Sequence, residues 1–270
     1  MTVSISCPVH STVIGDDGAP VRAVFLHGLF GRGKNFTTIA QALAPEVQSL
    51  MVDLPNHGQS GWTERFDYAD MADLVAEHLR AEFAARGPVA VIGHSMGGKV
   101  AMVLALRHPD LVRRLVVIDI SPDTGGEVRG EFPHLLSALA SLDLRAVHKR
   151  GEASAALREQ IPNSTVRGFL MQNLKREGDG FVWEPNLALL RAELDTVMGF
   201  PSDPGEPYEG PVLWMGGEKS DYVTDDDAPA MRALFPRTQR ITVKGAGHWV
   251  HAEQPDTVVA ALRRFLLPRG

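Results

Sequence analysis

In the stretch VAVIGHSMGG, residues 89–98, an apolar strand pattern changes into a helical one, which is the strongest indication of the fold in this sequence. VAVI is typical of a buried strand, and the following GKVAMVLALRHP is typical of a buried helix. Ser95 lies at the turn between them, with Gly93 and Gly97 two positions to either side. Glycines at these positions leave room for a tight, strained turn that lifts the serine oxygen clear of the sheet edge. The pattern therefore predicts that Ser95 is a nucleophile.

Strand-like and helix-like segments alternate along much of the chain. Strands are expected over residues 21–28, 47–54, 87–94, 114–121, 211–217 and 240–248. Helices are expected near residues 35–44, 68–86, 97–108, 228–235 and 255–267. Such alternation is typical of an α/β fold, in which helices cover both faces of a mostly parallel sheet.

The strand signal disappears between Ser121 and Gly210. Helical patterns replace it over residues 134–150, 152–161, 164–177 and 186–200, separated by Pro, Gly and Asn. The proline-rich segment 200–211 is typical of a linker. We therefore expect a core domain formed by residues 1–120 and 211–270, and a helical cap, or lid, inserted as residues 121–210.

Composition favours a small-molecule partner. The 270 residues are 44% hydrophobic and 22% charged, and the net charge of −6 offers no basic face for nucleic acid or anionic lipid. Neither a signal-peptide pattern nor an apolar run long enough for a membrane span is present, and Cys7 is the single cysteine. The expected protein is cytoplasmic, a monomer or homodimer, without nucleic-acid or membrane partners.

A serine nucleophile needs a base, and ten histidines compete for that role. His248 has the best position, because KGAGHWVHAEQP places it in a glycine-containing loop between the last strand and the last helix. The other candidates are expected to have structural roles: His27, His57, His94 and His251. No metal site is expected, because histidines and carboxylates do not follow a metal-ligand spacing such as H-E-x-x-H.

An oxyanion hole requires two backbone N–H groups that converge on the developing negative charge. Met96, directly after the nucleophile, is expected to supply one of them. Leu29, in the loop after the first predicted strand, is expected to supply the other. Phe30, Trp249 and Trp183 are the aromatic candidates for the substrate pocket.

Five segments resemble the α/β-hydrolase superfamily, and within it the small YbfF-like esterase subgroup. They are HGLFG (27–31), DLPNHGQS (53–60), GHSMGG (93–98), IDISP (118–122) and AGHWVHAE (246–253). The resemblance spans nearly the whole chain and is weakest across the cap. It implies an eight-stranded, mostly parallel sheet, a helical lid over the active site, and carboxylic-ester hydrolysis without a cofactor.

The histidine base needs an acid to orient it, and the position of this acid differs here from the usual pattern of the superfamily. In most relatives a G-x-x-D-x-x-V pattern supplies the acid, but here Ser220 stands at the carboxylate position and Asp221 lies one residue later. Neighbouring residues of an extended segment point in opposite directions, which disfavours Asp221. Asp119, at the end of RLVVID, is therefore the preferred acid, as the YbfF-like subgroup also implies. Asp221 stays as the alternative, with Ser220 as an accessory group.

These features predict a cofactor-free serine carboxylesterase for small to medium acyl chains, with thioesters as further substrates. An ester would be its small-molecule partner. The same fold and triad also serve C–C bond hydrolases, lactonases, acyltransferases and perhydrolases. A non-catalytic small-molecule receptor is the alternative from a different class of protein.

Overall fold

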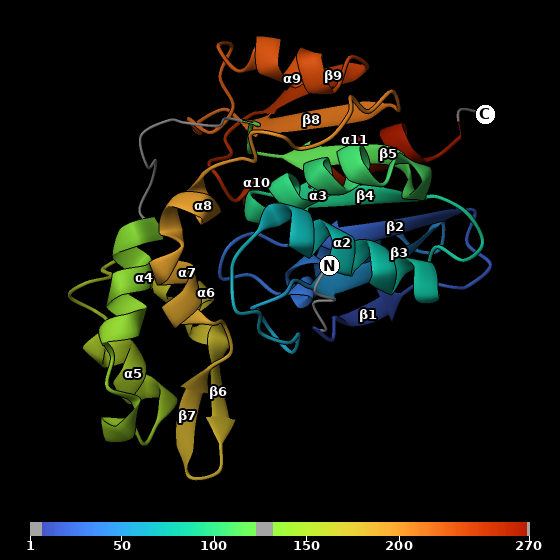
Figure 1. Ribbon diagram of the computed structural model, residues 1–270. Coiled ribbons are helices and arrows are strands. Elements are labelled where there is room, and N and C mark those ends of the chain that lie inside the picture. Colours follow the sequence, from blue (N-terminus) through green and yellow to red (C-terminus); the bar gives the residue numbers. More distant parts are fainter. Residues whose placement is uncertain (1–6, 123–131, 269–270) are drawn as a thin grey trace.

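The computed structural model describes residues 7–122 and 132–268 (Figure 1). Its main sheet has the strand order β1-β3-β2-β4-β5-β8-β9, and every neighbouring pair is parallel except β1 with β3. The strands are β1 (His10–Ile14), β2 (Val21–Leu26), β3 (Val47–Asp53), β4 (Val89–His94), β5 (Val112–Ile118), β8 (Val212–Gly217) and β9 (Thr238–Val243). The predicted α/β class with a mostly parallel sheet is confirmed.

The sheet has seven strands within the described residues, so the expectation of eight is wrong for this part of the chain. The antiparallel edge strand β1 was not predicted from the sequence either. Just before it, the carbonyl of Pro8 accepts a hydrogen bond from the backbone of Gly61, 2.8 Å away. The chain there pairs with a loop instead of adding another strand. The first six residues, in which no signal peptide was predicted, lie outside the described part.

Helices cover both faces of the sheet because side chains alternate between two cores. In β4, Val89 and Val91 join one buried cluster, whereas Ala90 and Ile92 join the other. The first cluster is covered by α2 (Tyr68–Ala81), α3 (Met96–Arg107) and α9 (Ala228–Leu234). The second is covered by α1 (Thr37–Leu43), α10 (Val250–Glu253) and α11 (Pro255–Leu266), and the short helices η1 (Gly33–Phe36) and η2 (Pro109–Leu111) lie in connections.

Residues 132–200, called the cap segment below, lie together beside the sheet (Figure 1). Its helices are α4 (Phe132–Ser141), η3 (Leu144–Ala146), α5 (Arg150–Ala156), α6 (Ser164–Leu170), η4 (Met171–Asn173), α7 (Leu187–Ala192) and α8 (Leu194–Met198). The predicted start of the cap includes residues 123–131, which are outside the described part. The division into core and cap domains stays a prediction.

The cap segment also contains a β-hairpin, so the expectation of helices alone is wrong there. Strands β6 (Leu174–Glu177) and β7 (Gly180–Trp183) pair antiparallel, where a helix over residues 164–177 was predicted. Gly178 has φ of 56° at the first position of the two-residue loop, where glycine is favoured. The local turn therefore overrides the helical periodicity before it.

Buried polar contacts tie the end of the cap segment to the nucleophile helix. Lys99, in α3, donates from Nζ to the carbonyls of Val197 (3.3 Å) and Gly199 (2.7 Å) at the end of α8. The Tyr68 hydroxyl donates to the same Val197 carbonyl at 2.6 Å. In the predicted linker, the Tyr208 hydroxyl donates to Val112 of β5 at 2.9 Å. The chain thus returns to the sheet along fixed contacts.

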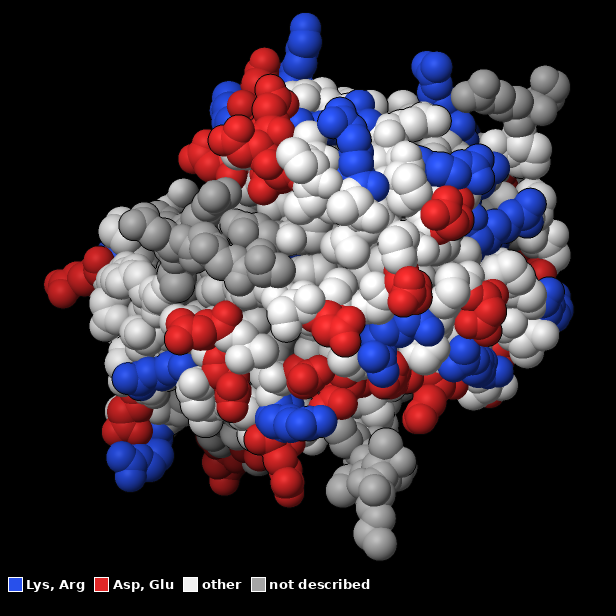
Figure 2. All heavy atoms as spheres, turned by 45° about the horizontal axis from the view of Figure 1, so that its top comes forward, with Lys and Arg blue, Asp and Glu red and all other residues white. Residues whose placement is uncertain are grey.

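Charged side chains of both signs are interspersed on the face shown in Figure 2. Within the described residues, helices that combine the length and apolarity needed to cross a bilayer do not occur.

Candidate active site

Ser95 lies in a sharp turn between β4 and α3. Its φ of 53° is left-handed, which is unusual for a residue other than glycine and indicates local strain. A Cβ atom at Gly93 would overlap the backbone of Gly97, and one at Gly97 would overlap the carbonyl of Leu26. These close approaches explain both glycines of the elbow.

The side chains of Ser95, His248 and Asp119 form a continuous hydrogen-bonded path, although they are far apart in the sequence. Ser95 Oγ lies 3.0 Å from His248 Nε2, and His248 Nδ1 lies 2.8 Å from Asp119 Oδ2. Asp119 directly follows β5, and His248 lies in the loop between β9 and α10. All three follow the carboxyl ends of parallel strands, which meet at one edge of the sheet.

Asp119 is fully buried, and both of its carboxylate oxygens accept hydrogen bonds. Oδ1 accepts from the backbone N–H of Gly217 at 2.8 Å, and Oδ2 accepts from both His248 and the hydroxyl of Ser220. These donors compensate for the cost of burying a carboxylate. Asp221 is exposed, and Asp119 is the carboxylate in contact with His248. Ser220 contacts Asp119, one of the two partners considered for it from the sequence.

The loop after β2 is a tight turn from Gly28 to Gly31. The N–H of Gly31 and Nδ1 of His27 both donate to the carbonyl of Gly28, each at 2.8 Å. His27 Nε2 accepts from the N–H of Leu54 at 3.0 Å, which fixes the proton on Nδ1. Burial lowers the pKa of His27 and keeps its ring neutral.

Both predicted oxyanion donors lie on turns next to Ser95. In a trans peptide the N–H points away from the preceding carbonyl, so the two bonds to the Gly28 carbonyl also orient the N–H of Leu29. A Cβ atom at Gly28 would lie 3.2 Å from Ser95 Cβ, which shows how closely the turn approaches the serine. Met96 begins α3, where the first N–H groups have no partner within the helix.

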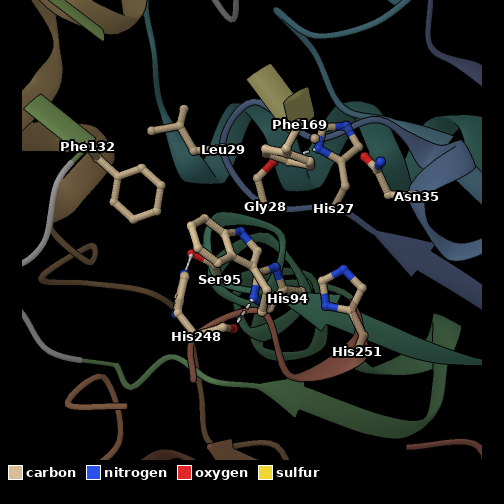
Figure 3. Close-up of a pocket in the computed structure, with 12 residues that line it drawn as sticks. His27, Gly28, Leu29, Asn35, His94, Ser95, Phe132, Phe169, His248 and His251 are labelled. Atoms are coloured by element: carbon tan, nitrogen blue, oxygen red, sulfur yellow. Dashed lines mark hydrogen bonds between the residues drawn. The ribbon is translucent and has the colours of Figure 1, made fainter. Parts of the chain in front are cut away.

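A pocket that is partly open to solvent surrounds Ser95 (Figure 3). Its lining comprises His27, Gly28, Leu29, Gly31, Asn35, His94, Ser95, Phe132, Phe169, His248, Trp249 and His251. Trp249 is part of this lining, whereas Phe30 and Trp183 are outside it. Phe30 is only 1% exposed and packs in the hydrophobic core, and Trp183 lies on the hairpin.

Three aromatic neighbours of the site were not assigned a definite place from the sequence. Phe132 and Phe169 reach the pocket from α4 and α6, and Tyr222 lies with its ring 4.1 Å from that of His248. Helical periodicity marks the two phenylalanines as apolar side chains of the cap segment but does not distinguish a pocket wall from a core position. Tyr222 has no sequence signal beyond its closeness to Ser220.

Two further histidines support the loop that carries His248. His94 Nε2 donates to the backbone carbonyl of His248 at 2.8 Å, and the ring of His251 lies 4.5 Å from that of His94. Burial lowers the pKa of His94 well below its usual value, and burial together with nearby His248 lowers that of His251 to about 4. Among the described residues, clusters of His, Cys, Asp and Glu suited to a metal ion do not occur.

Comparison with known proteins identifies the family. Residues 23–261 match the sequence profile described as "Alpha/beta hydrolase family". The chain belongs to this family. A curated relative of this α/β hydrolase is the "sn-1-specific diacylglycerol lipase ABHD11" of Mus musculus, 37% identical over 269 residues, which covers 96% of this chain and 85% of the relative.

Two further similarities indicate a smaller group within the family. "Esterase YbfF" of Escherichia coli is 32% identical over 243 residues, covering 90% of this chain and 92% of the relative. A solved structure titled "Marine microorganism esterase" superposes with a TM-score of 0.91 at 32% identity, covering 97% of this chain and all of the other. This α/β hydrolase is therefore of the YbfF-like group, and it is an enzyme of the esterase or lipase type.

Proposed function

We propose that this α/β hydrolase is a serine carboxylesterase that needs no cofactor and cleaves esters of small to medium acyl chains, and thioesters, through an acyl-enzyme. The observation that carries the proposal is the hydrogen-bonded path from Ser95 to His248 (3.0 Å) and on to Asp119 (2.8 Å). A serine hydroxyl is a poor nucleophile without such a base, and the base needs an acid to fix its tautomer.

In the first half-reaction, Ser95 Oγ attacks the acyl carbonyl while His248 Nε2 accepts the serine proton. Asp119 stabilises the imidazolium that forms, and the N–H groups of Leu29 and Met96 bind the oxyanion. When the tetrahedral intermediate collapses, the bond to the leaving alcohol breaks, and the alcohol takes the proton from His248. The acyl group then remains as an ester on Ser95.

In the second half-reaction, a water molecule loses a proton to His248 and attacks the acyl-enzyme. The same oxyanion donors stabilise the second tetrahedral intermediate. Its collapse breaks the bond to Ser95 Oγ, which recovers the proton from His248, and the carboxylic acid leaves. The enzyme returns to its starting state without an external oxidant or reductant.

The pocket supports an ester with an apolar acyl group, because Phe132, Phe169 and Trp249 contribute aromatic walls. Lysine, arginine, aspartate and glutamate do not occur among the residues that line it, so a neutral substrate fits better than a charged one. A small-molecule ester as the partner and a cytoplasmic location, both expected from the sequence, belong to the same proposal.

The decisive experiment is Ser95→Ala assayed with p-nitrophenyl butyrate. We expect turnover to fall at least about 10⁴-fold, because the nucleophile is lost while the fold is retained. Ser49→Ala is a matched control, since Ser49 is another buried serine and its hydroxyl has no hydrogen-bond partner within the described residues. A folded Ser95→Ala protein with unchanged turnover would overturn the proposal.

A fluorophosphonate probe then distinguishes an enzyme from a receptor, and a substrate panel identifies the type of hydrolase. The probe is expected to label Ser95, whereas absence of labelling together with ligand binding would favour a receptor. The panel contains p-nitrophenyl esters of increasing acyl length, a thioester, a lactone, a C–C hydrolase substrate and, because of the ABHD11 relative, a diacylglycerol. Preferential turnover of the lactone or the C–C substrate would replace the carboxylesterase proposal.

A further inference from the structure

Asn173 is a buried amide of the cap segment that contacts the turn carrying the proposed oxyanion donor. It is the last residue of η4 and is fully buried. Its Nδ2 donates to the carbonyl of Phe30 at 2.7 Å and to that of Leu170 at 3.3 Å. Through Phe30, the cap segment is thus hydrogen-bonded to the backbone of the Gly28–Gly31 turn.

Burial of this amide destabilises the folded protein. Its Oδ1 has no hydrogen-bond partner within residues 7–122 and 132–268, and a buried polar atom without a partner costs the folded state stability. A leucine of similar size would avoid that cost. What the amide adds is a hydrogen-bond donor for the Phe30 carbonyl.

That donor acts on a strained residue. Phe30 has φ of 61°, a left-handed conformation that is unfavourable for a residue other than glycine. The turn is held from the sheet side through the Gly28 carbonyl, which accepts from His27 at 2.8 Å. It is held from the cap side through the Phe30 carbonyl. Removing the second contact leaves the strain of Phe30 uncompensated, so other conformations of the turn become populated.

We propose that Asn173 is a positioning residue that holds the Gly28–Gly31 turn with the N–H of Leu29 directed at the reacting carbonyl. The inference rests on the proposed acyl-enzyme function and extends it, because the cap segment then helps to form the oxyanion hole. Asn173 touches neither substrate nor Ser95 in this role. It acts through the backbone of the turn.

A second contact between the cap segment and the same loop provides the control. Arg32 donates to Glu184 at 2.6 Å, and both side chains are largely buried. This ion pair joins two side chains and leaves the Phe30 carbonyl untouched. Glu184→Gln therefore weakens the attachment of the cap segment without removing the hydrogen bond from Asn173.

The test compares Asn173→Leu, Asn173→Asp and Glu184→Gln on an oxoester and on the matching thionoester, in which sulfur replaces the carbonyl oxygen. Sulfur is larger and a weaker acceptor, so an intact oxyanion hole favours the oxoester. Both Asn173 variants are expected to lower kcat for the oxoester about tenfold with little change in KM, and to reduce the ratio of oxoester to thionoester turnover. Glu184→Gln is expected to leave that ratio unchanged.

A merely structural role of Asn173 gives a different result, because loss of folded enzyme lowers turnover of both substrates by one factor. Titration of active sites with a fluorophosphonate measures the active fraction, and thermal unfolding measures the folded fraction. Asn173→Asp keeps the shape of the side chain and serves as the second variant if Asn173→Leu folds poorly. An unchanged ratio in both Asn173 variants, or an equal fall in Glu184→Gln, would overturn the inference while the esterase proposal stands. A wild-type protein that hydrolyses neither ester would overturn both.

Discussion

The carboxyl edge of the sheet and the cap segment contribute to the same pocket but are built differently. Every residue of β4 and of β8 is buried, and the hydrogen-bonded path of Ser95, His248 and Asp119 follows strands of this sheet. In α6, which carries Phe169, only Val166 and Leu170 are buried. The proposed reacting groups thus lie directly after β4 and β5 or in the loop after β9, whereas two aromatic pocket walls, Phe132 and Phe169, come from helices of the cap segment.

The largest loss of activity is expected from a substitution that breaks the hydrogen-bonded path at the sheet edge. Asp119→Asn should lower kcat by up to roughly 10⁴-fold, because an amide stabilises the wrong tautomer of His248 and cannot stabilise the imidazolium. Steady-state kinetics with p-nitrophenyl butyrate measure the loss, and circular dichroism checks the fold. Asp221→Asn is the matched control on an exposed carboxylate and should keep near-normal turnover. The reverse result would assign the acid role to Asp221.

A smaller effect is expected from buried histidines near the main sheet, because their protonation on unfolding makes stability depend on pH. Burial lowers the pKa of His57 to about 3 and that of His251 to about 4. The unfolded chain, with histidine pKa near 6.5, binds more protons than the folded protein in this range, so stability is present above about pH 6.5 and is lost as the pH falls. Each residue should reduce the free energy of unfolding by about 2 kcal/mol between pH 7 and pH 5.

Urea unfolding at pH 7, 6 and 5 measures this slope. His57→Gln should flatten it, because one of the buried histidine rings with a lowered pKa is removed. His134→Gln, at an exposed position of the cap segment, is the control substitution that leaves these buried rings in place. Equal stability at pH 7 and pH 5 in the wild-type protein would contradict the prediction.

The smallest effect is expected from a substitution in a wall of the pocket, which should change the preferred length of the acyl chain. Phe169→Ala should shift the preference toward longer acyl chains by about 0.8 kcal/mol for each methylene newly accommodated, roughly fourfold in kcat/KM, with kcat for the best substrate nearly unchanged. A series of p-nitrophenyl esters from acetate to octanoate measures the shift. Trp183→Phe is the control outside the pocket lining. If Trp183→Phe moves the preference as far as Phe169→Ala does, the wall is formed differently.

The sequence predicted the sheet better than the cap segment, for a physical reason. Buried parallel strands are short apolar runs bounded by turns, so β2, β3, β4, β5 and β8 are recognisable individually. The hairpin of β6 and β7 depends on the turn at Gly178, and its exposed strand residues, such as Lys175 and Arg176, carry no strand periodicity. Partial burial of the cap segment leaves few apolar positions from which to predict its structure.

Local patterns and turn chemistry in the sequence were enough to predict the parallel strands with their covering helices, the elbow at Ser95 and the loop position of His248, but not β1 or the hairpin of β6 and β7. The sequence left the acid open between Asp119 and Asp221, and it placed Phe30 in the pocket. The contact of Asp119 with His248, 129 positions along the chain, and the burial of Phe30 became visible in the folded structure. The folded structure also brought Asn173 to the Phe30 carbonyl, 143 positions away. Contacts over such separations depend on strand order and on packing, which no local pattern encodes.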